Sequence, residues 1–464
     1  MASHFSKPKS PQEQLAEQRR RRDGQGGSMI GAPPGEKNWL CLGKKIHGDL
    51  LPPHLGLRYQ NGWLYMAEEL LDQHLFLLGA TGAGKSETIK RLVKEILTNT
   101  DRRIYFVDGK GDEKLAGDIR SLTHHYNRDI PPVFKLGFDE PGAVYDGFRG
   151  QAADIYNRLL ALTGVTEMEG DSRYYADIIR SILQYVCHMP QGPPRSFEEV
   201  LARIDKQKLV DAYRNDQRRL ARINHLQDTD FQSLYYRMIP LVEDFETNVG
   251  DGGFALEEVR CAIFSMRVQS VGDTAQRFLD FLVEDLKDFV GKRQQHPAVL
   301  VIDEFGQFSN DKIIGLLTLA RSSRLGVILA TQDTSSLKDE NTKEQVLANT
   351  RTKILMSTDK PQDIAELAGT IYQIESSIQH EDGDVRGKGS ARVQHAFKVK
   401  PNEAGMQWSG EPYVIRQRHA VKMQVQQIGP VEQIAPQEPQ HRSVLEEAPA
   451  KAAAEKKKKR PPRL

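Results

Sequence analysis

Apolar runs of strand length alternate with amphipathic stretches along the middle of the chain. Residues 74–80 form such a run, and the sequence KSETIKRLVKEILTNT that follows residue 84 repeats apolar positions every three or four residues, as one face of a helix does. Continuous apolar strands are typical of sheets buried on both faces, and their alternation with helices favours parallel strands. The pattern therefore predicts an α/β core with a mostly parallel sheet, with strands at residues 74–80, 103–112, 259–266, 297–305, 325–333 and 351–359.

The interval of residues 150–256 has a different periodicity. Apolar residues recur there at spacings of three and four, and strand-like runs are nearly absent. We therefore expect an all-α domain inserted into the α/β core, between its second strand and the strand that begins near Val259. After residue 385 the alternation typical of strands returns, which predicts a short antiparallel addition at the edge of the core.

Both ends of the chain lack the apolar residues needed for a core. The first segment is rich in Ser, Pro, Gln, Arg and Gly and contains the run Arg19–Arg22, and the last segment ends in EKKKKRPPRL. Such compositions are typical of disordered segments. The predicted organisation is a disordered basic arm (1–37), the first part of the α/β domain (38–149), the all-α insertion (150–256), the second part of the α/β domain (257–430) and a disordered tail with a basic tip (431–464).

Composition narrows the class of protein. The 64 basic and 63 acidic side chains leave a formal net charge of +1, so any contact with nucleic acid must come from local basic patches. Cys41, Cys187 and Cys261 have no paired spacing, which argues against a disulfide framework or a zinc site and favours a reducing cytoplasm. No apolar run approaches the roughly 18 to 20 residues that cross a bilayer, and we therefore expect a soluble cytoplasmic protein.

A phosphate-binding motif follows the first predicted strand. The sequence GATGAGKS fits G-x-x-x-x-G-K-[ST], with a strand before it and a helix after it as the motif requires. Its glycines allow backbone N–H groups to turn towards phosphates; Lys85 would reach the β- and γ-phosphates of ATP, and the Ser86 hydroxyl would bind Mg²⁺. The α/β domain is therefore expected to bind nucleotide through Gly79, Ala80, Thr81, Gly82, Ala83, Gly84, Lys85, Ser86 and Glu87.

Polar residues end two later apolar strands. Asp303 and Glu304 close the run VLVIDE, and we predict that Asp303 binds Mg²⁺ and that Glu304 polarises the attacking water. Gln332 ends the run GVILATQ, where its amide can hydrogen-bond both the γ-phosphate and the water. The alternative for all three residues is that they simply end strands, as polar residues often do.

The helical sequence LARSSRLG precedes the strand that ends in Gln332. An arginine there could reach the γ-phosphate held by a neighbouring subunit, as an arginine finger does in a ring. Arg321 and Arg324 compete for this role, and either arginine could instead solvate the end of a helix.

Together these elements resemble the FtsK–HerA superfamily of DNA-pumping ATPases, and within it the TraD/TraG type of coupling protein for conjugation and type IV secretion. The sequences that carry the resemblance are GATGAGKS, VDGKGD (107–112), VIDEF (301–305), ARSSRLGVILATQD (320–333) and LANTRTKILMSTDKPQDIAELAG (347–369). In that family an arginine twelve positions before the strand-end glutamine, counted inclusively, acts as the finger, and this count selects Arg321. The resemblance thus implies the catalytic set Lys85, Glu304, Gln332 and Arg321 in a RecA-like core.

The resemblance also implies partners. It predicts a homo-hexamer that hydrolyses ATP with Mg²⁺ and moves DNA without sequence preference, together with a relaxase or relaxosome and secretion-channel components. Coupling proteins generally begin with two transmembrane helices, which this sequence lacks, so we expect either recruitment by a membrane partner protein or an anchor on another chain. The expected location is the cytoplasm, peripheral at the inner membrane through such a partner.

Two other functions remain open on the sequence alone. The chain could be an adaptor that binds ATP but mainly selects protein substrates for a secretion channel, with the all-α insertion and the tails as the receptor surface. It could also be a chromosome-segregation or repair translocase of the same superfamily.

Overall fold

The structure is a computed structural model of the chain. It describes residues 35–127, 129–165, 173–245, 247–292, 297–308, 311–320, 323–337, 339–381, 384–429 and 431, without the side chains of residues 292, 311, 373–381 and 384–392. The predicted arm and tail therefore lie outside the described residues, except for residues 35–37 and 431. Within the described ranges no helix is both long and apolar enough to span a membrane.

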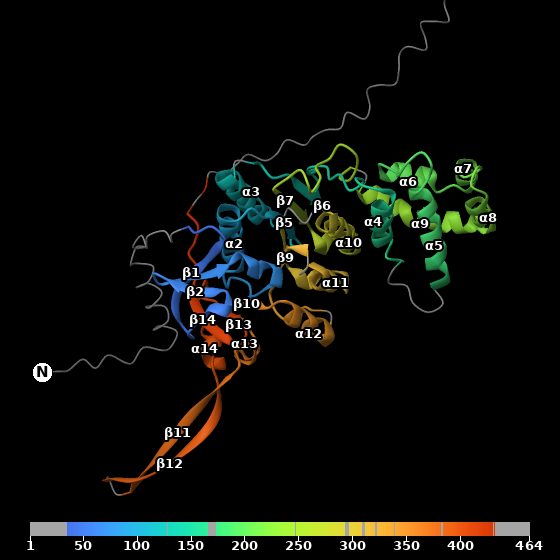
Figure 1. Cartoon of the computed structure of the whole chain (residues 1–464). Coiled ribbons are helices and arrows are strands. Elements are labelled where there is room, and N and C mark those ends of the chain that lie inside the picture. The colour runs from blue at the N-terminus through green and yellow to red at the C-terminus, as the bar shows by residue number, and fades with distance from the viewer. Residues whose placement is uncertain are drawn as a thin grey trace, which may run out of the picture.

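One sheet of 12 strands runs through the molecule in the order β2-β3-β1-β14-β13-β10-β4-β9-β8-β5-β7-β6 (Figure 1). From β10 to β6 every neighbouring pair is parallel. The prediction of an α/β fold with a mostly parallel sheet is thus confirmed. The parallel strands are β4 (Leu75–Leu78), β5 (Arg103–Asp108), β6 (Val133–Leu136), β7 (Cys261–Met266), β8 (Ala298–Asp303), β9 (Leu325–Thr331) and β10 (Thr352–Leu355).

Strand β6 is the one parallel strand that the sequence pattern did not reveal. It has only four residues, VFKL, and half of them are only partly buried. A run this short, with a lysine in it, gives no continuous apolar signal. The helical interval therefore begins after β6, the third parallel strand along the chain, and not directly after the second as we predicted from the sequence.

The predicted antiparallel addition to the core is confirmed for residues 413–424 only, because residues 391–397 belong to a separate hairpin and three further strands lie beyond β14. Strands β13 (Tyr413–Arg416) and β14 (His419–Gln424) pair with each other, and β13 continues the sheet beside β10. Beyond β14 lie three strands that precede the phosphate-binding motif in the sequence. The sequence pattern did not predict these strands. They are β1 (Trp39–Gly48), β2 (Leu57–Gln60) and β3 (Trp63–Ala67).

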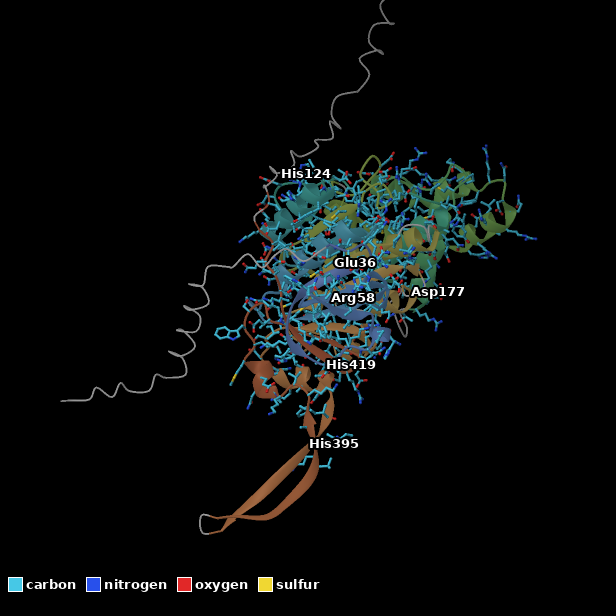
Figure 2. All side chains as sticks on the ribbon, turned by 60° about the vertical axis from the view of Figure 1, so that its left-hand side comes forward. Glu36, Arg58, His124, Asp177, His395 and His419 are labelled. Carbon is cyan, nitrogen blue, oxygen red and sulfur yellow. The ribbon has the colours of Figure 1, made fainter. Side chains whose placement is uncertain are left out.

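A long hairpin projects from the core as a separate two-stranded sheet (Figure 1). It consists of β11 (Thr370–Glu381) and β12 (Asp384–Phe397). His395 lies near the end of this hairpin that joins the core (Figure 2), and its ring contacts that of Tyr372 with centroids 4.5 Å apart.

Helices cover both faces of the sheet, because the apolar side chains of its strands alternate between two cores. In β4, Leu75 and Leu77 belong to one core, and Phe76 and Leu78 belong to the other. The first core includes α2 (Lys85–Asn99) and α3 (Glu113–Asn127). The second core includes α10 (Val268–Lys292), α11 (Asp311–Ala320) and α12 (Glu340–Asn349).

The six helices that the structure describes between β6 and β7 form a group at one side of the core (Figure 1). Their side chains join the same hydrophobic cluster as α10, for example through Phe197, which contacts Phe281 with ring centroids 6.3 Å apart. The division of the chain into an insertion of residues 150–256 and two parts of an α/β domain stays a prediction. The helices are α4 (Ala152–Thr163), α5 (Arg173–Cys187), α6 (Phe197–Arg203), α7 (Lys206–Ala212), α8 (Gln217–His225) and α9 (Asp228–Phe245).

Candidate nucleotide-binding site

The predicted phosphate loop connects the carboxyl end of β4 to the N-terminus of α2. Gly82 and Gly84 have φ angles of 79° and 103°, which L side chains rarely adopt. A Cβ atom at Gly79 would lie 2.9 Å from the Cβ of Met356, so this glycine is needed for close packing. The first N–H groups of α2 have no partner within the helix and carry its partial positive charge. The backbone N–H groups of the loop and the partial positive charge at the N-terminus of α2 therefore suit the binding of phosphate.

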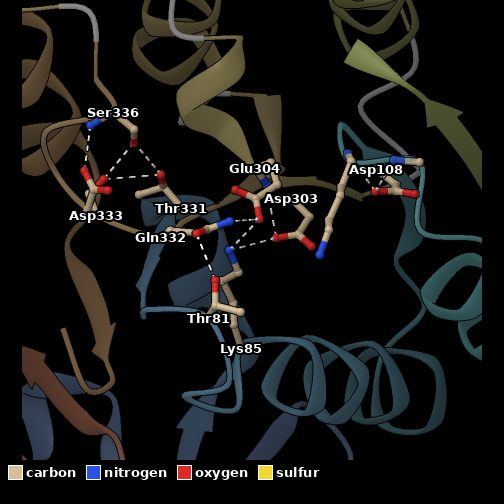
Figure 3. A network of polar contacts seen from close by, with 11 residues as sticks. Thr81, Lys85, Asp108, Asp303, Glu304, Thr331, Gln332, Asp333 and Ser336 are labelled. Carbon is tan, nitrogen blue, oxygen red and sulfur yellow. Dashed lines mark hydrogen bonds and ion pairs between the residues drawn. The ribbon is translucent and has the colours of Figure 1, made fainter. Parts of the chain in front are cut away.

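Three buried charges meet beside this loop. Lys85 Nζ lies 3.1 Å from Glu304 Oε1 and 3.6 Å from Asp303 Oδ1 (Figure 3). The three residues are 9%, 7% and 4% exposed, in that order, so water screens the two carboxylates little. Burial, together with the neighbouring Glu304, raises the pKa of Asp303, and Lys85 opposes this shift. The single positive charge of Lys85 does not neutralise both carboxylates, so a further cation at this position would be favourable.

Glu304 has a left-handed backbone, with φ 58° and ψ 41° directly after β8. A non-glycine residue in this region carries a strain of about 1–3 kcal/mol, which the surrounding fold must offset. The strained backbone directs the carboxylate towards the phosphate loop, where Oε1 accepts hydrogen bonds from Lys85 Nζ and Gln332 Nε2.

Gln332, directly after β9, connects the loop to the acids. Its Nε2 donates to Glu304 Oε1 at 2.9 Å, and its Oε1 accepts from Thr81 Oγ1 at 3.1 Å (Figure 3). Strands β4, β9 and β8 are neighbours in the sheet, and parallel strands bring their carboxyl ends to one edge. The structure thus brings together Thr81, Lys85, Asp303, Glu304 and Gln332, as expected for residues of one site.

The residues predicted to bind Mg²⁺ have suitable chemistry. The Ser86 hydroxyl, one residue beyond Lys85, has no hydrogen-bond partner in the part of the chain that the structure describes. Ser86 and Asp303 offer only oxygen atoms, which Mg²⁺ prefers, and Mg²⁺ is usually held by one or two protein groups plus phosphates and water. The described residues contain no group of three or more His, Cys, Asp or Glu side chains arranged for a metal.

Some predicted loop contacts are already made within the protein. The N–H groups of Gly79, Ala80 and Ala83 donate to the carbonyls of Thr331, Ser357 and Ala80, respectively. The Glu87 carboxylate pairs with Lys90 Nζ at 2.5 Å. Phosphate contacts from this loop are therefore left to its other N–H groups and to Lys85.

The arginine finger is not located by the structure, since Arg321 lies outside the described residues. Arg324 directly precedes β9, at the end of the strand opposite Gln332, and its carbonyl accepts from Ala298 N–H at 3.2 Å. A side chain at that edge of the sheet serves a phosphate loop only in another subunit. The preference for Arg321 over Arg324 therefore stays a prediction.

Asp108 belongs to the same edge of the sheet, but the sequence analysis gave it no role. It ends β5 beside Asp303 of β8, and it is fully buried. Its Oδ1 accepts from the N–H groups of Lys110 and Gly111, and its Oδ2 accepts from the Ser265 hydroxyl at 3.0 Å. Burial raises the pKa of Asp108 to about 6. Its position at the end of an apolar strand, like that of Asp303, could have identified Asp108 from the sequence.

We expect the Asp108→Asn variant to change how stability depends on pH. A carboxyl group with a raised pKa stabilises the folded state fully below its unfolded pKa of about 4, and this contribution is lost as the pH rises through about 6. The free energy of unfolding of the wild type, relative to the variant, should therefore fall by about 2 kcal/mol between about pH 4 and about pH 7. Urea unfolding in the presence of a metal chelator measures this difference. A difference that stays constant across this range would contradict the assignment.

The class of protein follows from this arrangement. A parallel sheet with a phosphate loop after β4, two acids after β8 and a glutamine after β9 defines a P-loop protein with a RecA-like core.

Two segments of the sequence match known family models. Residues 64–112 match the model described as "Helicase HerA, central domain", and residues 297–400 match the model described as "TraM recognition site of TraD and TraG". These segments hold the phosphate loop and the residues Asp303, Glu304 and Gln332. A search of curated proteins finds no match.

Solved structures share the fold over most of the chain. The bacterial conjugative coupling protein TrwBdeltaN70, in an unbound form, is 16% identical with a TM-score of 0.61, over 88% of this chain and 97% of that chain. The plasmid coupling protein TrwB in complex with ADP and Mg²⁺ is 17% identical with a TM-score of 0.55, over 87% and 98%. VirB4 of Thermoanaerobacter pseudethanolicus is 13% identical with a TM-score of 0.53, over 86% and 98%.

The resemblance to the coupling proteins of the FtsK–HerA superfamily, predicted from the sequence, is thereby confirmed. The two family models confirm it in sequence over their matched residues, and the solved structures confirm it in fold.

Proposed function

We propose that the chain is an ATPase that binds ATP with Mg²⁺ and hydrolyses it at the site described above. The observation that carries the proposal is the buried cluster in which Lys85 of the phosphate loop contacts Asp303 and Glu304. The solved complex of the similar protein TrwB with ADP and Mg²⁺ supports the choice of ligand.

Each residue of the cluster has a role in this proposal. Lys85 and the N–H groups of the loop hold the phosphates, and Ser86 and Asp303 hold Mg²⁺, which supplies positive charge to the phosphate oxygens. Glu304 accepts the proton of the attacking water at its carboxylate. Gln332 orients that water, because its amide already lies between Thr81 and Glu304. Arg321 of a neighbouring subunit completes the site in a homo-hexamer.

We further propose that hydrolysis drives the movement of DNA in conjugation or type IV secretion. The match of residues 297–400 to a model described as a TraM recognition site supports docking to a relaxosome, and the fold shared with TrwB and VirB4 supports association with a secretion channel. The chain would contact DNA through its phosphates and therefore without sequence preference. In this proposal it works in the cytoplasm and reaches the inner membrane through a partner protein.

The adaptor function has an observation of its own. Large aromatic side chains are exposed on two helices of the group between β6 and β7, where Tyr174 and Tyr236 are 70% and 69% exposed. Exposed aromatic residues on a helical surface are typical of protein interfaces. In this alternative the helices select secreted proteins, and ATP hydrolysis serves that selection.

ATP hydrolysis measured with and without DNA distinguishes the two functions. For the motor we expect single- or double-stranded DNA to stimulate phosphate release, and we expect the Lys85→Ala variant to abolish it. If no DNA stimulates release while a secreted protein binds residues 150–256 tightly, the adaptor function replaces the motor.

A further inference from the structure

A segment near the C-terminal end of the sheet lies on the phosphate loop. Residues 407–411, QWSGE, follow the short helix α14 (Pro401–Gly405) and precede β13. Ser409 is 327 positions from Gly82 in sequence, and yet their atoms are in contact. The segment lies outside the phosphate-binding motif.

The contacts go to the backbone carbonyls of the loop. Ser409 Oγ donates to the carbonyl of Gly82 at 2.8 Å, and the N–H of Gly410 donates to the carbonyl of Ala83 at 3.0 Å. The approach is close, because a Cβ atom at Gly84 would lie 2.9 Å from the nitrogen of Gly410. Hydrogen bonds from Ser409 and Gly410 therefore fix two consecutive peptide units of the loop.

The segment is itself fixed to the sheet. Gln407, which is 8% exposed, donates from Nε2 to the carbonyls of Leu355 and Glu411. The carbonyl of Gly410 accepts from the N–H of Val425 at 2.8 Å. The segment is thus a rigid support rather than a loose loop beside the site.

The direction of these hydrogen bonds matters for phosphate binding. The carbonyl and the N–H at the two ends of a trans peptide unit point in opposite directions. Holding the carbonyl of Ala83 therefore turns the N–H of Gly84 the other way. Holding the carbonyl of Gly82 fixes the neighbouring peptide unit, whose N–H, that of Ala83, donates to the carbonyl of Ala80. A loop held in this way before the ligand arrives loses less conformational entropy on binding.

We propose that Ser409 and Gly410 are positioning residues of the phosphate loop, which orient its peptide units for the phosphates of the nucleotide. This inference rests on the proposed function, because it concerns the same site. It assigns the support to a segment outside the P-loop motif, and it places the effect on nucleotide affinity rather than on the chemical step.

Ser409→Ala in the full chain tests the proposal. The side chain is exposed, so its removal leaves the core packing unchanged. One hydrogen bond of this kind is worth about 0.5–1.5 kcal/mol, and we therefore expect the dissociation constant of a fluorescent ADP to rise about two- to tenfold. The KM for ATP should rise by a similar factor, while kcat stays within about twofold of the wild type. Ser409→Thr keeps the hydroxyl and should restore the affinity.

A second readout needs no nucleotide. In the nucleotide-free chain, amide hydrogen exchange across residues 79–86 should be faster in Ser409→Ala than in the wild type. The matched control is Ser181→Ala on α5, which removes a hydroxyl that donates to the carbonyl of Asp177 at 2.8 Å far from the site. This control should change neither the exchange of the loop nor the affinity for ADP.

The outcomes separate this inference from the proposed function. If the wild type binds ADP and hydrolyses ATP, but Ser409→Ala matches it in affinity and in exchange, the positioning role is wrong and the proposed function stands. A wild type that binds no ADP, alongside faster loop exchange in Ser409→Ala, would instead remove the proposed function and leave Ser409 as a purely structural support. A fall in kcat at unchanged KM would also overturn the inference.

Discussion

Glu304→Gln is expected to lower the kcat of ATP hydrolysis about a hundredfold to ten-thousandfold, which is the usual contribution of a general base. The side-chain amide keeps an oxygen that can accept from Lys85 and Gln332, whose contacts with Glu304 Oε1 are 3.1 Å and 2.9 Å. The site should therefore keep its shape and lose only the group that takes the proton. Affinity for ATP should be equal to that of the wild type or higher, since one of two buried negative charges is removed.

Phosphate release and equilibrium binding of an ATP analogue measure these two effects. The matched control is Glu284→Gln on α10, because Glu284 also pairs with a lysine, Lys287, at 2.7 Å but belongs to no part of the proposed site. That variant should keep its kcat within about threefold of the wild type. Turnover by Glu304→Gln at the wild-type rate would show that another group takes the proton.

Arg158→Met is expected to destabilise the protein by about 3–5 kcal/mol, the cost of removing one partner from a buried ion pair. Arg158 on α4 is 3% exposed, and its Nη2 lies 2.6 Å from Asp285 Oδ1 and 3.2 Å from Asp288 Oδ2 on α10. Its Nη1 donates to the carbonyls of Gly147 and Arg149. Methionine would leave Asp285 buried without a counter-charge.

Urea unfolding gives the free energy for this variant and for a matched control. Arg180 pairs with Asp177 on α5 at 2.8 Å, but its side chain is 34% exposed, and Asp177 lies at the surface (Figure 2). Arg180→Met should therefore cost less than about 1 kcal/mol. Equal losses in the two variants would mean that the Arg158 cluster does not anchor α4 to α10.

The acids and the glutamine of the candidate site could be predicted because each lies at the end of a strand. In a parallel sheet the carboxyl ends share one edge, so the end of an apolar run indicates where its polar neighbour lies. This reasoning found Asp303, Glu304 and Gln332, and the phosphate-binding motif found Lys85; the structure brings these four residues together. It applied equally to Asp108 at the end of β5, whose burial could not be read from the sequence.

Other features depend on contacts that leave no local pattern. Ser409 reaches Gly82 across 327 positions, and nothing in QWSGE itself indicates a phosphate loop as its partner. Strand β1 joins the sheet beside β14, although the two lie at opposite ends of the described chain. Pairings between distant strands are set by the tertiary fold, whereas the periodicity of a segment shows only which of its faces is buried.

A crystal structure of the chain with Mg²⁺ and a non-hydrolysable ATP analogue tests the central claim most directly. We predict that Lys85 Nζ, which lies 3.1 Å from Glu304 Oε1, contacts the phosphates in that complex. Ser86 and Asp303 should hold the same Mg²⁺, directly or through one water. Nucleotide bound elsewhere, or bound here with Mg²⁺ away from Ser86 and Asp303, would contradict the account.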